Sequence, residues 1–359
     1  MRNFFISLSL MLSSVVLCGS CAKTSYLYHQ SVGQLKLLRS AKPNSEVLKD
    51  ATISEVAKER IKKIQELKDF FYTFFSHPTS NIYSTVVFLE REAVTYLVIA
   101  SPYDEVKAHE EWFPLMGDFP YLGFFSEEHA KEWAGKLEKE GLITYIRPVY
   151  AYSTLGYFED PILSSFFHWN DWELVNVIFH ELFHTIFFIK NEVDLNESLA
   201  DYFAEELAKL YFKFEGDKLA EIEKKLAMSQ KIATMIRQKS DVLNARYVTA
   251  KGTTAVLDRT LAQQVYQEFE KEFKLEGRQM CAEGKIADED CLPLERKWNN
   301  AAFAAFLTYD QESDRIRALH KRLNLNLPQF LQHLELAYKK YKHDGRDEDF
   351  VGYLMAQKE

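Results

Sequence analysis

Apolar residues recur at steps of three and four residues along most of the chain, which is the spacing of amphipathic helices. The pattern is clear over residues 32–39, 53–75 and 126–140, and Ser126 and Gly141 supply the cap and the stop of the last segment. From Asn170 onwards nearly the whole chain follows this pattern. One long stretch there carries a single apolar stripe of Leu219, Ile222, Leu226, Ile236 and Leu243. We interpret the stripe as core packing rather than as a partner-binding face.

Three shorter segments have the composition of β-strands. Residues 85–89 and 94–100 are rich in β-branched and aromatic side chains, and the charged residues 90–92 between them predict a hairpin. Residues 142–152 are also expected to be extended. Because no repeat, low-complexity tract or proline-rich linker divides the chain, we predict a single α+β domain over residues 21–359. It should be predominantly helical, with a small β-sheet before Asn170 and a helical C-terminal half.

The composition is that of a folded protein without affinity for nucleic acid. Hydrophobic residues make up 47% and aromatic residues 14% of the chain, which is too rich for a disordered protein. The 53 acidic residues exceed the 44 lysines and arginines, giving a formal charge of −9. Since proteins hold phosphate backbones with a basic surplus, this balance argues against a nucleic-acid partner.

The N-terminus has the pattern of a lipoprotein signal peptide at residues 1–20. Arg2 precedes an uncharged run of 14 residues at positions 4–17, which is shorter than the roughly 20 apolar residues of a membrane-spanning helix. Small residues then lead to Cys21, whose thiol would accept the lipid, although Cys18 stands where leucine is usual. An ordinary secreted protein cut nearby is the alternative. We expect a lipid on Cys21, a short tether at about residues 22–30 and a place in the cell envelope, on the outer membrane facing the periplasm if the host has two membranes.

Two further cysteines form a candidate pair. If Cys21 carries lipid, Cys281 and Cys291 remain, flanking a polar stretch in which Gly284 allows a turn. An oxidising compartment favours a disulfide between them. Two free thiols are the alternative, because the geometry of the loop cannot be judged from sequence.

The candidate chemistry begins on the helix that a capping box of Asn170 and Glu173 opens. This helix contains the sequence His-Glu-Leu-Phe-His at residues 180–184. His180 and His184 lie on the same face one turn apart, so both imidazoles can reach one metal ion. Glu181 is rotated by about 100° around the helix, where a carboxylate can take a proton from zinc-bound water. The alternative is a pair of histidines held by hydrogen bonds on a buried helix.

A second helix supplies a third ligand. The polar residues 190–194 interrupt the apolar run, and residues 195–204 are again helical. Glu197 and Asp201 are four residues apart and therefore share one face. Glu197 completes the two-histidine, one-glutamate set of several catalytic zinc sites, and Asp201 can accept the second ring N–H of a zinc-bound histidine. For Asp201 taken alone, a solvated surface charge is the alternative.

With these residues the chain resembles the gluzincin class of zinc peptidases, in which the downstream glutamate is the third ligand and the aspartate four residues later supports a histidine. More specifically, it resembles the bacterial "putative aminopeptidase" family. The resemblance extends over residues 33–38, 151–156, Asp160-Pro161, both motif helices and residues 298–301 leading to Tyr309. It implies a zincin-like fold and a zinc-dependent aminopeptidase. The Gly-x-Met-Glu-Asn element of the well-studied gluzincin aminopeptidases is missing.

Three segments are candidates for contacts with substrate. By the same resemblance, an edge strand formed by Tyr152, Ser153, Thr154 and Gly156 would bind the substrate backbone, with a core strand as the alternative. Asp160, beside the rigid Pro161, is a candidate anchor for the substrate's amino group, although Asp-Pro is also a common turn. Tyr309 is a candidate oxyanion donor, with a buried structural tyrosine as the alternative.

The sequence as a whole predicts a lipid-anchored zinc peptidase acting on peptides. Zinc would be held by His180, His184 and Glu197, with Glu181 as the general base. The first hypothesis is an aminopeptidase, and the alternative within the enzyme class is an endopeptidase or a cell-wall peptide hydrolase. A non-catalytic, zinc-stabilised envelope lipoprotein is a third, against which Glu181 argues because a structural site has no need of it.

Overall fold

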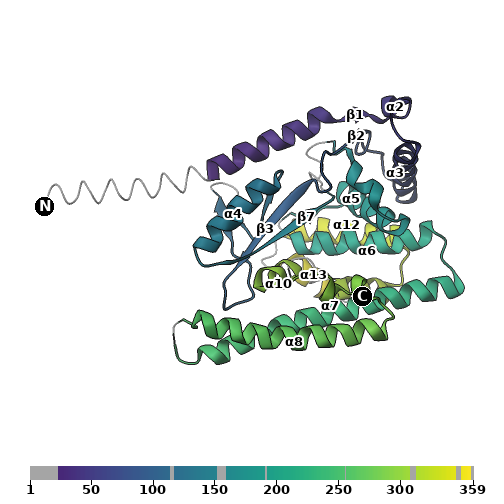
Figure 1. Ribbon diagram of the computed structural model, residues 1–359. Helices are drawn as coiled ribbons and strands as arrows, with labels where there is room; N and C mark the ends of the chain where they lie inside the picture. Colours follow the sequence, from purple (N-terminus) through teal and green to yellow (C-terminus); the bar gives the residue numbers. More distant parts are fainter. Residues whose placement is uncertain are drawn as a thin grey trace.

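The computed structural model describes residues 23–113, 117–151, 159–190, 192–254, 256–307, 313–344 and 349–356. Helices predominate and the strands form small sheets, which confirms the predicted α+β, mostly helical fold class (Figure 1). The finer zincin-like arrangement stays a prediction. Among the described residues, no helix is both long and apolar enough to cross a membrane.

The strands form three small sheets. In the first, β2 (Thr85–Val87) lies between β1 (Lys42–Pro43) and β8 (Ile162–Leu163), antiparallel to β1 and parallel to β8. In the second, β3 (Thr95–Ser101) lies between β6 (Leu122–Phe124) and β7 (Ile143–Val149), and all pairs are antiparallel. The third is the two-stranded pair of β4 (Glu111–Phe113) and β5 (Gly117–Phe119).

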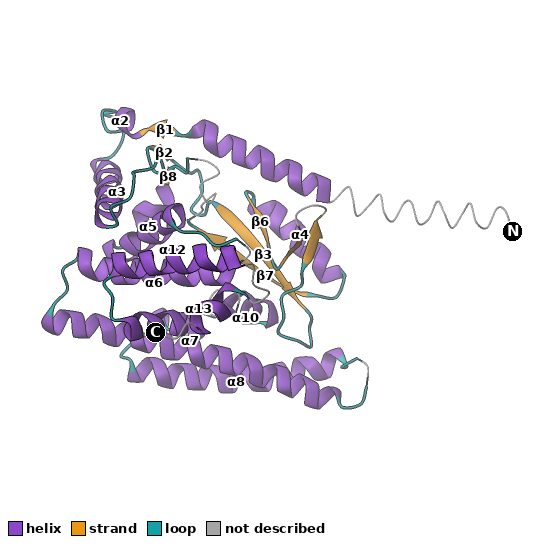
Figure 2. Ribbon diagram, turned by 180° about the vertical axis from the view of Figure 1, so that it is seen from behind, coloured by secondary structure: helices purple, strands orange, loops and turns teal. Residues whose placement is uncertain are grey.

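The second sheet is covered by a different helix on each face. Successive residues of a strand point to opposite faces, so Val98 and Ala100 of β3 pack with helix α4 (Glu127–Lys139). Ile99, between them, packs instead with Ala301 and Ala305 of α10 (Asn300–Leu307). Figure 2 shows these strands between α4 and α10. The alternation therefore fixes which side chains of β7 face α10.

The predicted hairpin of residues 85–100 is wrong, although both of its strands form. β2 and β3 lie in different sheets. The reason is that their apolar residues join different cores: Val86 and Val87 belong to the large core of the molecule, and Val98 belongs to the smaller core under α4. Residues 88–94 carry the chain from one sheet to the other instead of turning it back.

The large core is built from helices on both sides of the candidate motif. α5 (Asp171–Ile186) packs on α6 (Val193–Tyr211). Phe203 of α6 stacks on Phe183 of α5 at 4.5 Å and on Phe330 of α12 (Leu327–Asp344) at 5.5 Å between ring centroids. All three rings are buried. Further helices that contribute to this core are α2 (Asn44–Val47), α3 (Glu55–Phe74), the 3₁₀ helix Ser164–His168, α11 (Ser313–Leu323) and α13 (Phe350–Ala356), together with Leu37 of the helix at residues 23–40.

The helices α7 (Gly216–Lys251) and α8 (Arg259–Glu283) form a long antiparallel pair at one side of the molecule (Figure 1). Its core contains Phe269, Phe273 and Trp298, and the short α9 (Leu292–Glu295) packs against α8. Of the predicted stripe on α7, Ile236 and Leu243 are fully buried and the more N-terminal members are half-buried. Cys281 and Cys291 are joined in a disulfide, with their Cα atoms 5.9 Å apart.

The first described helix spans residues 23–40. Tyr26 packs against the rings of Phe113, Phe124 and Trp133, with centroids 5.1–6.0 Å apart. The part of the expected tether that the structure describes, residues 23–30, is therefore helical and contacts the rest of the molecule through Tyr26. These aromatic contacts hold the helix against β4, β6 and α4.

Candidate metal centre

The helix α5 begins and packs as its sequence predicts. The Glu173 N–H donates to Asn170 Oδ1 at 3.0 Å and the Asn170 N–H donates to Glu173 Oε2 at 3.2 Å, which is the capping box. Leu174, Ile178 and Leu182 are fully buried on the core face of the helix. His180 and His184 are presented on another face, toward α6.

A buried asparagine fixes the connection between α5 and α6. The side chain of Asn196 accepts a hydrogen bond from the Ile189 N–H at 2.9 Å and donates one to the Ile189 carbonyl at 2.7 Å. Asn196 is only 2% exposed, so both bonds are made away from water, where an unmade bond would be costly. This clamp sets the register of the next residue, Glu197, against the histidines of α5.

The three predicted ligands come together between the two helices. His180 Nε2 lies 3.3 Å from Glu197 Oε2, and His184 Nε2 lies 3.5 Å from Glu197 Oε1. The two Nε2 atoms are 3.2 Å apart. One donor atom from each residue lies within 4.8 Å of the other two. This spacing is small enough for all three to hold one metal ion.

The hydrogen bond between His180 and Asp201 also supports a metal site. His180 Nδ1 lies 2.6 Å from Asp201 Oδ1. A carboxylate at this position keeps the proton on Nδ1 and leaves a lone pair on Nε2. That lone pair faces a second imidazole nitrogen and a carboxylate, so all three donors can point at one cation. The residues present therefore fit a metal ion.

The two histidines are electrostatically unequal. Burial lowers the pKa of His180, but the carboxylates of Asp201, Glu197 and Glu181 outweigh burial and raise that pKa well above its ordinary value. Burial and the neighbouring His180 lower the pKa of His184 to about 4. Burial acts to raise the pKa of Glu197, but His180 and His184 lower it overall. The carboxylates therefore favour one positive charge in the cluster, either a proton on His180 or a metal ion in its place.

Glu181 is half-buried on α5 beside the cluster. Its carboxylate also affects Tyr83. The pKa of Tyr83 is raised well above its ordinary value, mainly because the side chain is buried and further because the carboxylates of Glu181 and Asp160 are near. Tyr83 is 1% exposed and has a positive φ of 60°. Its N–H donates to the Asp160 carbonyl at 2.8 Å, and its own carbonyl accepts from the Asn44 side chain at 2.8 Å. An uncommon backbone conformation is thus held in place close to the candidate base.

Two cavities meet at Asp201. The first, of about 310 Å³, runs past α5 and α6 to α7 and α11, and the second, of about 210 Å³, lies between Asp201, β7 and α10. The first is lined by Trp172, Asn176, Asp201, Tyr202, Glu205, Leu226, Ser229, Gln230, Ala233 and Arg317. The second is lined by Tyr145, Arg147, Asp201, Ala233, Arg296, Ala302, Ala305 and Phe306. A substrate near the cluster thus has space on two sides of Asp201.

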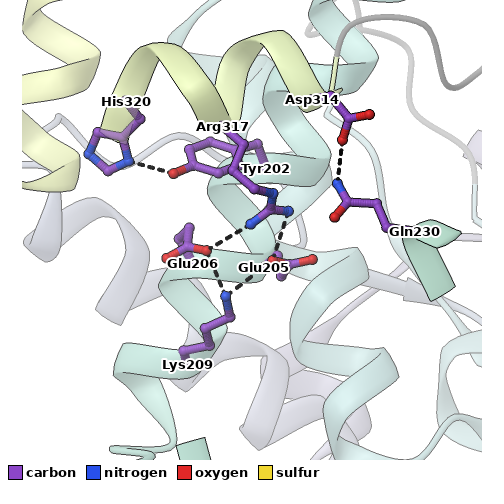
Figure 3. A network of polar contacts seen from close by, with 8 residues as sticks. All are labelled: Tyr202, Glu205, Glu206, Lys209, Gln230, Asp314, Arg317 and His320. Carbon is purple, nitrogen blue, oxygen red and sulfur yellow. Dashed lines mark hydrogen bonds and ion pairs between the residues drawn. The ribbon is translucent and has the colours of Figure 1, made fainter. Parts of the chain in front are cut away.

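Arg317 and Glu205, which line the first cavity, belong to a network of polar and charged residues (Figure 3). Arg317 of α11 points at α6 and donates to Glu205 at 3.1 Å and to Glu206 at 3.4 Å. Lys209 donates to the same two carboxylates at 3.2 and 2.6 Å. Tyr202 is bonded to His320 Nδ1 at 2.5 Å. These contacts fasten α11 to the helix that carries Glu197 and Asp201.

The candidate substrate residues are only partly within the described chain. Tyr152, Ser153, Thr154, Gly156, Tyr309 and the lipidation residue Cys21 lie outside the described residues. Asp160 is described and is 2% exposed, and its role as an amine anchor stays a prediction. Asn299 caps α10, because its Oδ1 accepts from the Ala302 N–H at 2.8 Å, and its amide donates to the Thr144 carbonyl at 3.0 Å. It is therefore a structural residue.

Sequence reasoning missed three residues around the site: Tyr83, Arg147 and Arg296. Each comes from a segment far from residues 180–201 along the chain, and none stands in a recognisable motif. The one available signal was at Arg147, a charged residue within the apolar and β-branched run of residues 142–152.

The fold and the site define a helical protein whose two central helices present a candidate metal centre of two histidines and one glutamate. The chain belongs to the family described as "Putative aminopeptidase", which matches residues 25–348. The resemblance to this family is thereby confirmed and indicates a peptidase acting on peptides, whereas the resemblance to the gluzincin class stays a prediction. Comparisons with curated proteins and with solved structures find no match to this chain.

Proposed function

We propose that this protein is a zinc-dependent aminopeptidase in which His180, His184 and Glu197 hold the metal ion. The observation that carries the proposal is the convergence of the three donor groups within 4.8 Å, with Asp201 hydrogen-bonded behind His180. Two imidazoles and one carboxylate, with a carboxylate supporting a histidine, are the composition of catalytic zinc sites. Membership of the aminopeptidase family supports the activity.

When bound, zinc would polarise the scissile carbonyl and lower the pKa of water to about 7. Glu181 would accept a proton from the attacking water on its carboxylate and then give this proton to the leaving amine. Asp201 would keep the proton on His180 Nδ1 and so hold the ring with Nε2 toward the ligand cluster. The partial exposure of the side chains of His180 (18%) and Glu197 (26%) leaves the cluster accessible to a substrate.

The metal assignment is tested by the metal content of the purified protein. We expect about one zinc per chain, the stoichiometry of a mononuclear site, and loss of most of it in His184→Ala. Full zinc occupancy in that variant would refute the ligand set. A screen of peptides with free and with acetylated N-termini, with and without chelator, tests the activity. Efficient cleavage of the acetylated peptides would replace the aminopeptidase by an endopeptidase.

We also propose that the protein is held in the cell envelope by lipid on Cys21. The support is the uncharged run of residues 4–17 followed by Gly19, Ser20 and Cys21. Mass spectrometry of the mature N-terminus should find acyl chains on Cys21, and Cys21→Ser should release the protein from membranes or block its processing. An unmodified Cys21 in the mature protein would refute this anchor.

A further inference from the structure

The helix at residues 23–40 has an inner face that packs on the rest of the protein. Tyr26, Gly33 and Leu37 follow one another at steps of seven and four residues and therefore share this face. Tyr26 packs against three aromatic rings, and Leu37 is 5% exposed in the large core. A Cβ atom at Gly33 would collide with the ring of Phe125, so glycine allows the helix to lie this close. The inner face accounts for the attachment of the helix to the protein.

The outer face of the same helix is also apolar, but it is exposed. Tyr28, Val32 and Leu35 are spaced by four and three residues, so they lie along one side of the helix. Their exposed fractions are 66%, 45% and 49%. Ser31 lies beside them, and its hydroxyl is satisfied within the helix because it donates to the Leu27 carbonyl at 2.8 Å. Single exposed apolar side chains are ordinary, whereas three on one helical face form a patch of the kind that contacts a partner or a membrane.

This helix carries no carboxylate. Residues 23–45 contain no aspartate or glutamate, although the whole chain has 53 acidic residues. Lys36 and Arg39 are exposed near the C-terminal end of the helix, and their long stems allow the charge to stay in water beside a buried apolar face. Lys36 pairs with Glu90, and such an exposed pair contributes little. The apolar side chains, rather than a surplus of positive charge, are therefore what the helix offers to a partner.

The position of the helix in the chain identifies the partner. One residue, Ala22, separates Cys21, the proposed site of the lipid, from the first described residue of the helix, Lys23. Two residues of fully extended chain span at most about 7 Å, so a lipid on Cys21 keeps the start of the helix at the surface of the bilayer. An interfacial helix buries its apolar face by roughly 5–10 Å, at the boundary between head groups and acyl chains.

We propose that the helix at residues 23–40 lies flat on the membrane and inserts Tyr28, Val32 and Leu35 between the lipid head groups. Tyrosine suits this depth, because its ring is apolar and its hydroxyl can reach water. The inference rests on the proposed anchor at Cys21 and adds a second contact, which fixes the orientation of the protein rather than its attachment. In both ribbon views the helix lies at one side of the molecule and the α7–α8 pair at the other, with α5 and α6 between them (Figure 1, Figure 2). The α7–α8 pair therefore points away from the bilayer.

A single fluorescent label tests this orientation in the lipidated protein. After removal of the signal peptide, Cys21 carries lipid and Cys281 is bonded to Cys291, so Leu35→Cys introduces the one free thiol of the mature chain. This thiol is labelled with nitrobenzoxadiazole, and the protein is placed, one copy per disc, in phosphatidylcholine nanodiscs with and without nitroxide on the lipid head groups. The nitroxide should quench most of the emission, and because the contact is apolar the loss should persist in high salt. Leu275→Cys on α8, which is 57% exposed, is the matched control and should keep its emission.

A second variant removes the apolar contact itself. Tyr28→Glu places a carboxylate on the outer face and should abolish most of the quenching at position 35, because burying a charge is costly. Val248→Glu changes a similarly exposed apolar residue of α7 (70%) and should leave the quenching unchanged. Val32→Cys provides a second label position on the same face. Circular dichroism and zinc content establish that each variant is folded.

The proposal is overturned if the label at position 35 keeps its emission, if high salt restores the emission, or if the control label is quenched equally. A shift of the emission to the blue that appears only when several copies share one vesicle would assign the outer face to a second copy of the chain, and would also overturn it. Mass spectrometry of the same sample separates these results from failure of the anchor. An unmodified Cys21 refutes the anchor and the inference together, whereas acyl chains on Cys21 with an unquenched label refute the inference alone.

Discussion

The helix pairs α5–α6 and α7–α8 are both packed side by side, but the side chains between their helices are of different kinds. Across α5 and α6, the stacked rings of Phe183 and Phe203 adjoin the polar contacts of His180 with Glu197 and Asp201. Between α7 and α8, the core is apolar and the polar contacts stay at the rim, where Arg246 pairs with Glu272 and Lys239 with Glu276. The first pair therefore holds imidazoles and carboxylates between its helices, whereas the charged side chains of the second that the structure describes lie at its rim.

The difference has an energetic consequence. Burying charged or polar groups costs free energy unless each is paired, and His184 Nδ1 is buried without a partner among the described residues. The α5–α6 pair compensates with a large aromatic core and with the buried clamp of Asn196. The α7–α8 pair buries no charged side chain among its described residues and is joined to the following segment by a disulfide. Substitutions in the two regions should accordingly separate function from stability.

The largest effect is expected for Glu181→Gln on α5. The substitution keeps the shape of the side chain and all three ligands, but removes the general base, which typically contributes about 10²–10⁴-fold to the rate. Peptide hydrolysis should fall by that factor while the zinc content stays at about one per chain. Rates from a chromatographic peptide assay and zinc from atomic absorption measure the two quantities on the same sample.

The matched control is Glu173→Gln, on the same helix two turns away from Glu181. Glutamine can still complete the capping box with Asn170, so both activity and zinc should be retained. Full activity in Glu181→Gln would move the general base to another residue. Loss of zinc in the same variant would mean that Glu181 is itself a ligand.

The second largest effect is expected on the stability of the protein, and it concerns the α7–α8 pair. Replacing Cys281 and Cys291 together by alanine opens a loop with a sequence separation of 10, whose closure is worth about 3 kcal/mol in the chain-entropy description. The free energy of unfolding, measured with denaturant, should fall by about that amount. Zinc content under native conditions should not change, because both cysteines belong to the core of α7 and α8, whereas α5 and α6 belong to the large core. A variant that folds but has lost its zinc would show that the two regions depend on each other.

Much of this architecture could be predicted because its signals are local. The capping box of Asn170 and Glu173 and the cap at Ser126 are short-range patterns, and both occur as expected. The i, i+4 spacings of His180 with His184 and of Glu197 with Asp201 fix each pair on one helical face. Whether the two faces would meet depends on the turn between the helices, which Asn196 sets through contacts that no spacing reveals.

The pairing and packing of segments that are distant in the sequence could not be predicted from the hydrophobic pattern. The segment 85–100 has the composition of a hairpin, but burial in two separate cores places its strands in different sheets. Arg147 reaches the metal region because β7 pairs with β3, opposite Leu97, and because α10 has small residues. The packing of Tyr26 likewise depends on three rings that are distant in sequence. Such partners are chosen by tertiary packing, which overrides local propensity.

The smallest effect is expected for Asp201, and it should show whether this residue supports a metal ligand or is itself a ligand. Asp201→Asn keeps an oxygen that can accept the His180 N–H but removes the negative charge that raises the pKa of His180. Loss of such a supporting group typically lowers metal affinity by about 10- to 100-fold, so the variant should still bind zinc, but more weakly in competition with a chelating dye.

Glu205→Gln, one turn further along α6, is the control: Glu205 pairs with Lys209 and Arg317 instead of a histidine, and its loss should leave zinc affinity nearly unchanged. Equal affinity in Asp201→Asn and the unmodified protein would reduce Asp201 to a surface charge, whereas complete loss of zinc would make it part of the ligand set. An intermediate affinity assigns it to holding the ring of His180 while the three ligands alone hold the metal.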